Sequence, residues 1–585
     1  MGLMSESAAV PARFDVWAPL ADEARIVVDG VSSDLLRDAT RAGWWYADPA
    51  QVTPRAGQRY AYEIFNGTQW SQPLPDPRTR AQPDGVHEPS LVVSTDFAWT
   101  DHQWQGRELA GQVIYELHVG TFSAEGTFAG VVDKLAYLVD LGVTAIELMP
   151  VQPFGGTRNW GYDGVDWFAV HEAYGGPEGL KHLVDAAHNA GLGVILDVVY
   201  NHFGPDGNYN SLFGPYLAPG QTSWGDVVNF SGAASDEVRA FVLDAVRQWL
   251  EEFHIDGLRL DAVHAYDDRR AYSIMEDIRS VADDVASRTG IPRSLIAESD
   301  LNDPRLIDDV DHGGYGLSAQ WLDDVHHALH TVVSGERQAY YVDYGTLDIL
   351  ADTLSHGYRF RNTYSQYRRH NHGRAIELDR VPPARLITYT TTHDQTGNRA
   401  TGDRPSQYLT AAQLALKAAV VLFSPFTPML FMGEEFAART PFPFFCSHTD
   451  AELNRLTREG RFTEFSRLGW GRDEVPDPAD PATFDAARLD WEFDSEQKRL
   501  LAAYRRLISL RGELGLARGD LRELQVDHGA TWLTMGSDDV VLAANFSNQP
   551  ATAPVGGTLV YSFGTPQVGD AEVSLGPWDF AILRR

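Results

Sequence analysis

The chain has 585 residues, and its 48 Lys and Arg against 81 Asp and Glu give a net charge of −33 with His neutral. This acidic balance argues against nucleic acid as a partner, because binding to a polyanion requires a basic surface that displaces counterions. A neutral substrate is therefore favoured. The length suggests about three or four domains of ~150 residues, or one large barrel with additions.

The cysteine content and the first residues favour a cytoplasmic location. Cys446 is the single cysteine, which excludes an intrachain disulfide, and the first twenty residues lack the basic start and apolar block of a secretory signal. The most apolar stretch, residues 416–433, contains Lys417 and two prolines. We therefore expect a buried helix, a turn and a strand there rather than a membrane span, and no membrane association.

Residues 1–95 are predicted to form a small N-terminal β-sandwich. Strand-like runs such as RFDVWAP, ARIVVDG and YAYEIFNG alternate there with Gly, Pro and Asp turn signals. The proline-rich stretch 73–85 is typical of a connection between domains, and residues 96–111 are predicted to be a linker.

Eight short apolar segments then recur, each with a helical candidate behind it. They are VIYELHVG from Val113, TAIELMP from Thr144, GVILDVV from Gly193, DGLRLDAV from Asp256, SLIAES from Ser294, GLSAQW from Gly316, LITYTT from Leu386 and PMLFMG from Pro428. Strands that are apolar along their length are covered on both faces, so the pattern predicts an α/β fold, a (β/α)8 TIM barrel over residues 112–516. An open doubly wound sheet is the structural alternative.

The clearest helical stripe lies in residues 235–253, where we expect Ser235 or Asp236 to cap the helix. The Gly-, Asn- and Pro-rich interval from about 203 to 231 is too long for an ordinary loop and predicts an excursion after the third strand. Strand patterns return near the end, so residues 517–585 are predicted to form a C-terminal antiparallel β domain.

Polar side chains stand at the ends of several predicted barrel strands. They are Asp197 and His202 on the third, Arg259, Asp261 and His264 on the fourth, Glu298 on the fifth, and His393 and Asp394 on the seventh. Because the C-terminal ends of barrel strands meet at one face, we expect these groups to lie together. Each acid could alternatively be a helix cap or turn residue. Arg259 could be purely a structural ion-pair partner, although an opposite charge would also keep Asp261 ionised.

Aromatic and histidine side chains leave further alternatives open. Trp160 and Tyr162 are candidates for stacking on a sugar ring, with core packing as the alternative. The pair His326 and His327 is predicted to lie on a solvated helix. No His, Cys or acid cluster has metal-ligand spacing, so no metal and no cofactor are predicted.

Two carboxylates on adjacent strands of one rim suit glycoside chemistry, with one as acid and then base and the other as nucleophile or base. Four motifs in chain order, DVVYNH, GLRLDAV, IAES and THDQ, resemble those of the α-amylase superfamily of glycoside hydrolases. Within it, AESDLNDPR, HDQTGNRA and MGEEFAARTPFPFFCSH look most like the maltooligosyltrehalose trehalohydrolases. The resemblance implies retaining hydrolysis of the α-1,4 bond next to a terminal trehalose unit, and a carbohydrate-binding-like N-terminal sandwich.

The resemblance also implies a role for each matching residue. Asp261 would be the nucleophile, Glu298 the acid and base, and Asp394 the group that holds ring hydroxyls. The implied substrate-binding residues are Tyr162 as stacking platform, Asp197 as supporting acid, and His202, Arg259, His393, His264 and Trp160. A retaining enzyme should hold its two carboxyl groups about 5–5.5 Å apart. Common amylases have a Lys-His pair where this chain has His264 and Ala265, so the leaving-group side should differ.

Two alternatives remain. A glucan branching or debranching enzyme would share the architecture and the acids, and a non-catalytic carbohydrate-binding protein could use the same fold. In every case the expected partner is an oligosaccharide. Coupling to a maltooligosyltrehalose synthase is implied by the resemblance alone.

Overall fold

The protein is built around a closed barrel of eight parallel strands, seen in a computed structural model that describes residues 10–467 and 470–585. In chain order the strands are β8 (Ile114–Leu117), β9 (Ala145–Leu148), β10 (Gly193–Val198), β13 (Gly257–Leu260), β14 (Ser294–Ala297), β15 (Ala319–Trp321), β18 (Leu386–Tyr389) and β19 (Thr427–Phe431). Each pairs with its neighbour, and β19 closes on β8. All eight predicted segments are thus confirmed as strands of one barrel, and the open sheet is excluded.

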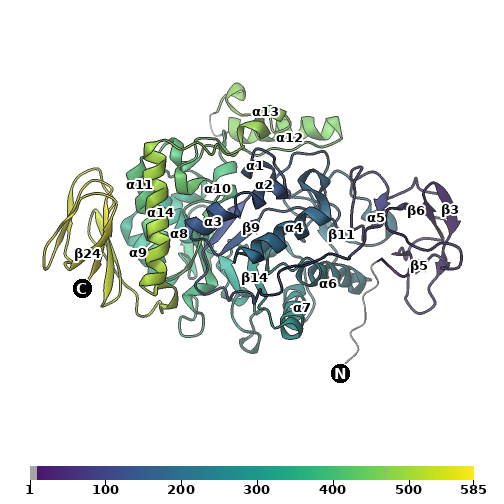
Figure 1. Cartoon of the computed structure of the whole chain (residues 1–585), viewed down its shortest axis with the longest axis horizontal. Helices are drawn as coiled ribbons and strands as arrows, with labels where there is room; N and C mark the ends of the chain where they lie inside the picture. Colours follow the sequence, from purple (N-terminus) through teal and green to yellow (C-terminus); the bar gives the residue numbers. More distant parts are fainter. Residues whose placement is uncertain (1–9, 468–469) are drawn as a thin grey trace.

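The strands are buried on both faces, because helices surround the barrel (Figure 1) and apolar side chains of the strands fill its interior. The helices are α1 (Val119–Phe122), α2 (Phe128–Val132), α3 (Leu135–Leu141), α4 (Gly176–Asn189), α5 (Asn210–Phe213), α6 (Ser235–Glu251), α7 (Ile274–Thr289), α8 (Asp323–Ser334), α9 (Leu347–His356), α10 (His393–Gly397), α11 (Ala411–Phe423), α12 (Ala451–Ser466), α13 (Pro481–Ala486) and α14 (Ser495–Glu513). The apolar stretch 416–433 forms the end of α11, a turn and β19, as predicted. No described helix combines the length and apolar character needed to span a bilayer.

Two small antiparallel sheets form the N-terminal end of the molecule (Figure 1). One contains β1 (Asp15–Trp17), β5 (Trp44–Tyr46) and β4 (Leu36–Arg37); the other contains β3 (Val31–Asp34), β2 (Glu23–Val28), β6 (Arg59–Phe65) and β7 (Ser90–Leu91). The proline-rich stretch 73–85, which lies between β6 and β7, contacts helix α6. Arg78 Nη1 donates to Asp244 Oδ2 of α6 at 2.8 Å, and Trp44 Nε1 donates to Glu237 Oε2 at 3.2 Å. These contacts fix the sheets against the barrel.

Two excursions leave the C-terminal side of the barrel. The predicted one follows β10 and contains α5 and the antiparallel pair β11 (Leu217–Gln221) and β12 (Asp226–Val228). A second one, absent from the sequence prediction, lies between α8 and β18. It contains the 3-10 helix η5 (Ala339–Asp343), α9 and the hairpin of β16 (Thr363–Ser365) and β17 (His370–His372).

The C-terminal domain consists of two antiparallel sheets at the end opposite the N-terminal sheets (Figure 1). The five-stranded sheet contains β20 (Gln525–His528), β21 (Trp532–Gly536), β22 (Val540–Asn545), β27 (Phe580–Arg584) and β24 (Thr558–Ser562). The three-stranded sheet contains β23 (Ala551–Ala553), β26 (Val573–Leu575) and β25 (Gln567–Val568). The antiparallel β domain is confirmed, whereas the exact domain boundaries stay predictions.

Two local predictions are wrong. Helix α6 begins at Ser235 as its first helical residue, and its N-cap is Ala234, with a left-handed φ of 60° and no side-chain cap. The second concerns His326 and His327 on α8: His326 is only 1% exposed, and His327 is half-buried. His326 hydrogen bonds the Thr390 carbonyl and the Tyr341 hydroxyl, so packing against β18 and η5 overrides the polar character of the pair.

Candidate active site

The structure brings three of the predicted acids together around one buried arginine. Arg259, on β13, has no solvent exposure. Its Nη1 donates to Asp197 Oδ2 at 2.8 Å and to Asp261 Oδ1 at 2.7 Å. Its Nη2 lies 3.6 Å from Glu298 Oε2. Because β10, β13 and β14 are adjacent parallel strands, their C-terminal ends place the acids on one guanidinium, which neutralises part of their mutual repulsion.

Asp261 is held by two donors and stays accessible. Its Oδ2 accepts a hydrogen bond from Asn201 Nδ2 at 2.6 Å, and its side chain is 14% exposed. The next residue, Ala262, has a φ of 41°, in the left-handed region that costs a non-glycine residue energy. This kink turns the Ala262 N–H toward Glu298 Oε2, at 2.6 Å. Asn201 was not predicted from the sequence as a site residue, although it lies inside the DVVYNH motif.

Glu298 has the environment of a carboxylic acid that holds its proton. Burial raises its pKa to about 8; Arg259 opposes this, and the charges of Asp261 and Asp394 add to it. Burial also raises the pKa of Asp197, to about 6, but the two hydrogen bonds from Arg259 favour its ionised form. Near pH 7 the rim therefore pairs a protonated Glu298 with a carboxylate at Asp197.

His393 and Asp394 begin α10, directly after β18. His393 Nδ1 lies 2.5 Å from Glu116 Oε1, and its backbone N–H donates to Glu116 Oε2 at 3.1 Å. Burial lowers the pKa of His393, but Asp394 and Glu116 outweigh it and raise that pKa to about 9. The ring is therefore a cation, and its Nε2 lies 3.5 Å from Asp394 Oδ1. Asp394 has 40% of its side chain exposed, so it can reach a ligand.

The two aromatic candidates behave differently. Tyr162 donates to Asp197 Oδ2 at 2.6 Å, and its ring stacks on His393 with centroids 5.2 Å apart. Trp160 is only 4% exposed, stacks on Phe442, and donates to the Pro443 carbonyl at 3.1 Å. The structure places Tyr162 within the group of acids and favours the packing alternative for Trp160.

His202 and His264 both lie near an aromatic residue that was not singled out from the sequence. His202 is 4% exposed and hydrogen bonds Asn201, whereas His264 is exposed. Trp224, in the turn between β11 and β12, lies 6.5 Å from the His202 ring and 6.0 Å from the His264 ring, centroid to centroid. It is 50% exposed, so a large apolar ring faces solvent beside the predicted substrate-binding residues. The sequence feature that could have identified Trp224 is its position in the Gly-rich excursion after the third strand.

A further carboxyl group at the rim was also missed. Asp323 follows β15 and accepts hydrogen bonds from the Tyr389 hydroxyl and from Gln395 Nε2, the latter at 3.3 Å. Burial raises its pKa to about 7, the Tyr389 hydrogen bond opposes this, and Asp394 is among the charges that raise it. Asp323 is in turn among the charges that raise the pKa of Glu298.

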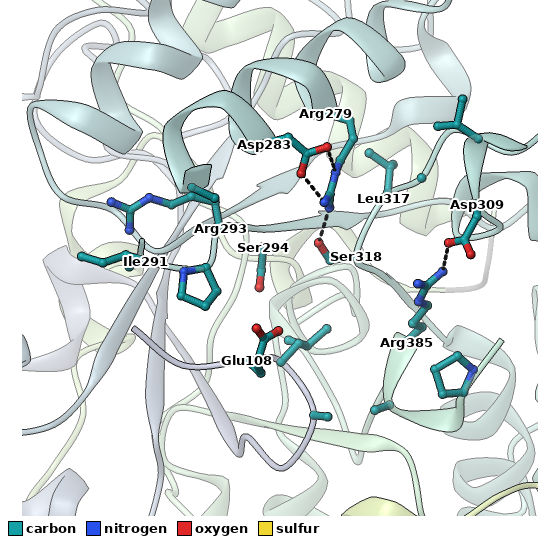
Figure 2. Close-up of a pocket in the computed structure, with 18 of the residues that line it drawn as sticks. Glu108, Arg279, Asp283, Ile291, Arg293, Ser294, Asp309, Leu317, Ser318 and Arg385 are labelled. Atoms are coloured by element: carbon teal, nitrogen blue, oxygen red, sulfur yellow. Dashed lines mark hydrogen bonds and ion pairs between the residues drawn. The ribbon is translucent and has the colours of Figure 1, made fainter. Parts of the chain in front are cut away.

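A cavity of about 700 Å³ lies at the opposite end of the barrel (Figure 2). Its lining includes Ser294, the first residue of β14, and Arg385, which directly precedes β18. Figure 2 shows Arg279 paired with Asp283, and Arg385 paired with Asp309, along this cavity. Since none of the predicted site residues lines it, we place the active site at the acidic rim.

In residues 10–467 and 470–585, no group of three or more His, Cys, Asp and Glu side chains has an arrangement that could hold a metal ion.

The chain is similar to known proteins along nearly its whole length. The family model described as "Alpha amylase, catalytic domain" matches residues 77–212, and a domain of unknown function, DUF3459, matches residues 520–582. A malto-oligosyltrehalose trehalohydrolase of Mycobacterium tuberculosis is 49% identical over 580 residues, covering 98% of this chain and 99% of its own.

Two further relatives are more distant. A 1,4-alpha-glucan branching enzyme of Corynebacterium jeikeium is 30% identical over 408 residues, covering 63% of this chain and 56% of its own. A crystal structure from Salmonella typhimurium, provisionally described as an alpha amylase, has a TM-score of 0.89 and 33% identity, covering 99% of this chain and 100% of its own.

Proposed function

The chain belongs to the malto-oligosyltrehalose trehalohydrolase family of α-amylase-type glycoside hydrolases, and on this premise we propose the reaction and the residues that perform it. The protein hydrolyses the α-1,4-glucosidic bond next to the terminal trehalose unit of maltooligosyltrehalose. The products are trehalose and a maltooligosaccharide. The substrate is a neutral oligosaccharide, in keeping with the chain's net charge of −33.

In the first step Asp261 attacks the anomeric carbon of the glucosyl unit while Glu298 gives its proton to the glycosidic oxygen. The C–O bond to trehalose breaks, trehalose leaves, and a glycosyl ester forms on Asp261. In the second step Glu298, now a carboxylate, takes a proton from water, and the hydroxyl attacks the same carbon and releases Asp261. Two inversions give retention of configuration.

The single observation that carries this assignment is the sharing of Arg259 by Asp261 and Glu298. Asp261 contacts Nη1 at 2.7 Å, and Glu298 lies 3.6 Å from Nη2, so the two carboxyl groups face one guanidinium. Their environments differ: burial raises the pKa of Glu298 and favours its protonated form, whereas Asp261 accepts hydrogen bonds from Arg259 and Asn201. A short separation of about 5–5.5 Å between them remains the expected geometry for retention.

The surrounding groups suit a reacting sugar ring. Asp394, the most exposed acid of the set, would accept hydrogen bonds from ring hydroxyls, next to the His393 cation. Tyr162 would stack under the ring, and His202 would contact a hydroxyl. We assign to Asp197 and Arg259 the role of holding Asp261 in position. We assign to His264 a contact with the trehalose unit that leaves.

A product assay tests the proposal. Trehalose-capped maltooligosaccharide should yield free trehalose, and the reducing end of the released maltooligosaccharide should appear first as the α-anomer by proton NMR. New branch points or released branches on glycogen, without free trehalose, would establish the branching or debranching alternative. If the unaltered protein binds the oligosaccharide without any turnover, a non-catalytic role is supported.

The variant Glu298→Gln tests the assignment of the acid. It should lower turnover about 10²- to 10⁴-fold and retain oligosaccharide binding. Full turnover of this variant would assign the acid to another residue.

We also propose a metabolic partner and a cellular location for this protein. A substrate with a trehalose cap must come from an enzyme that converts the reducing end of a maltooligosaccharide, so functional coupling to a maltooligosyltrehalose synthase is proposed. A cytoplasmic location is proposed from the single cysteine, Cys446, which is buried and unpaired with another cysteine.

A further inference from the structure

The barrel interior contains a layer of acidic residues next to an apolar layer. Ile114 of β8, Ala145 of β9 and Ile195 of β10 pack together in the apolar layer. Because successive strand residues face opposite sides, the residue two positions further along each strand also points into the barrel. These residues are Glu116, Glu147 and Asp197. The register of β8 and β9 places Glu116 directly opposite Glu147.

Glu116 contacts His393 through both of its carboxyl oxygens. Oε1 lies 2.5 Å from the ring nitrogen Nδ1, and Oε2 accepts the backbone N–H at 3.1 Å. The two residues are 277 positions apart in the chain, and each side chain is 1% exposed. The contact at Nδ1 leaves Nε2 as the ring nitrogen that faces Asp394, 3.5 Å from Oδ1. Glu116 therefore determines which edge of the ring is turned toward the sugar site.

Aromatic rings enclose the two faces and the remaining edge of His393. Tyr162 stacks on the ring with centroids 5.2 Å apart, and Trp160 and Trp321 meet it at steep angles, at 5.3 and 6.1 Å. These neighbours supply no charge to balance an imidazolium. The plane of the ring is thus set by packing, and its orientation within that plane is set by Glu116.

The charge of His393 depends on buried and exposed partners. Burial lowers its pKa, Asp394 and Glu116 raise that pKa to about 9, and Arg259 opposes the two acids. Asp394 is 40% exposed, so water screens its charge more than that of the buried Glu116. The titratable or charged groups that face His393 are Glu116 on β8, His118 after it, Glu147 on β9, Tyr162, Arg259 on β13 and Asp394 on α10.

Glu147 has the same residue type and the same burial as Glu116 but different contacts. It is 1% exposed, and its Oε2 has no hydrogen-bond partner among the described residues. Burial raises its pKa well above the ordinary value, the charges of Glu116 and Asp197 add to this, and Arg259 and His393 oppose it. Glu147 therefore holds its proton near neutral pH. The layer thus contains one glutamate that contacts His393 and one that does not.

We propose that Glu116 is a positioning residue for the reaction, because it fixes the His393 ring so that Nε2 can donate a hydrogen bond to a hydroxyl of the reacting sugar beside Asp394. The inference rests on the proposed function, since its ligand is the maltooligosyltrehalose substrate. A carboxylate accepts hydrogen bonds and an imidazolium donates them, so Asp394 and His393 together can satisfy both sides of a hydroxyl group. Such contacts strengthen as the sugar ring approaches its oxocarbenium-like transition state.

The pH dependence of binding tests this role. Binding of maltotriosyltrehalose is measured by calorimetry in the Glu298→Gln background, which removes the titration of the acid. Affinity should fall as the pH rises through about 9, because His393 then loses the proton that Nε2 donates. Glu116→Gln removes one of the charges that raise this pKa, so the fall should begin at lower pH. The dissociation constant at about pH 8 should increase about three- to tenfold.

Glu147→Gln is the matched control, because it replaces a neutral acid of the same layer with an amide of the same shape. In the Glu298→Gln background its binding should have the same pH dependence as the background alone. An equal shift for Glu147→Gln and Glu116→Gln, or no shift for Glu116→Gln, would overturn the role of Glu116.

Turnover provides a second test with Glu298 intact. Glu116→Gln should lower kcat/KM for trehalose release about 10- to 100-fold, and it should add little to His393→Gln, because Glu116 acts through that ring. Fully additive losses in the double variant would contradict the proposal. If circular dichroism shows that Glu116→Gln is unfolded, Glu116→Asp replaces it: the shorter side chain keeps the charge but not both contacts, so kcat/KM should still fall, and an unchanged kcat/KM would count against the role.

Trehalose release by the unaltered protein separates this inference from the proposed function. If no trehalose appears, but Glu116→Gln still shifts the pH dependence of binding and Glu147→Gln does not, the proposed reaction fails and the role of Glu116 remains. If trehalose appears and neither variant shifts that pH dependence, the reaction stands and the role of Glu116 fails.

Discussion

At the residue scale, one cation organises the rim. Arg259 is fully buried and contacts carboxylates from its own strand and from β10, so its planar guanidinium matches several acceptors at fixed angles. Burial raises the pKa of Glu298 to about 8 and that of Asp197 to about 6, so these two neighbouring acids differ in how readily they hold a proton. The sequence placed Asp261 and Glu298 on adjacent strands, but only the three-dimensional contacts reveal that they share this arginine.

The substitution Arg259→Lys should lower turnover about 10²-fold or more, because an ammonium is a point charge that cannot replace the several fixed contacts of a guanidinium. Turnover is measured as trehalose release, with circular dichroism as the check that the fold is retained. Near-normal turnover in a folded variant would mean that Arg259 is only a structural ion-pair partner, the alternative that the sequence left open.

The pH dependence of kcat/KM should reflect Glu298. Its pKa is raised to about 8, and the acid must be protonated to act, so activity should fall as the pH rises through about 8. Asp323→Asn removes a negative charge that raises this pKa, so the basic limb should move to lower pH. The rate of trehalose release is measured from roughly pH 5 to roughly pH 10, an interval that includes the pKa of Glu298 and both limbs of the profile. A limb that stays in place would show that Asp323 does not influence Glu298.

At the element scale, the barrel strands were predictable and the N-cap of α6 was not. Each barrel strand is a short apolar run buried on both faces, a pattern that local sequence carries. The start of α6 is different: the chain enters through Ala234 in a left-handed conformation, imposed by the loop that Asn229 ties together through the Ala233 carbonyl at 3.0 Å. Ser235 and Asp236 are residue types that often cap helices, but the geometry of the preceding loop places the N-cap at Ala234.

The substitution Ala234→Gly should stabilise the protein by about 0.5–1 kcal/mol, because glycine adopts a positive φ without the steric cost that a Cβ brings. Thermal unfolding followed by circular dichroism should show a higher midpoint. The neighbouring Ala233→Gly is the control and should not raise it. A lower midpoint for Ala234→Gly would mean that the gain in unfolded-state entropy dominates.

At the whole-molecule scale, the charge of −33 argues against a polyanionic ligand and is compatible with a neutral one. A neutral oligosaccharide is neither attracted nor repelled at long range, so kcat/KM for trehalose release should change less than about twofold between low and moderate salt. The assay is run at several ionic strengths with unfolding monitored in parallel. A steep salt dependence would indicate a charged substrate and would contradict the proposed reaction.

The sequence by itself determined the barrel, the C-terminal β domain and the four rim motifs, because burial periodicity and strand-end polar residues are written locally. Only the tertiary structure decided how the pieces meet: the interior position of His326, the second excursion with its hairpin, and the carboxyl group of Asp323 beside the rim. These features depend on contacts between residues far apart in the chain, and local patterns carry no record of such partners. The stretch SDLNDP after Glu298 is the clearest case, since Asp300 meets its ion-pair partner Arg368 only in the folded chain.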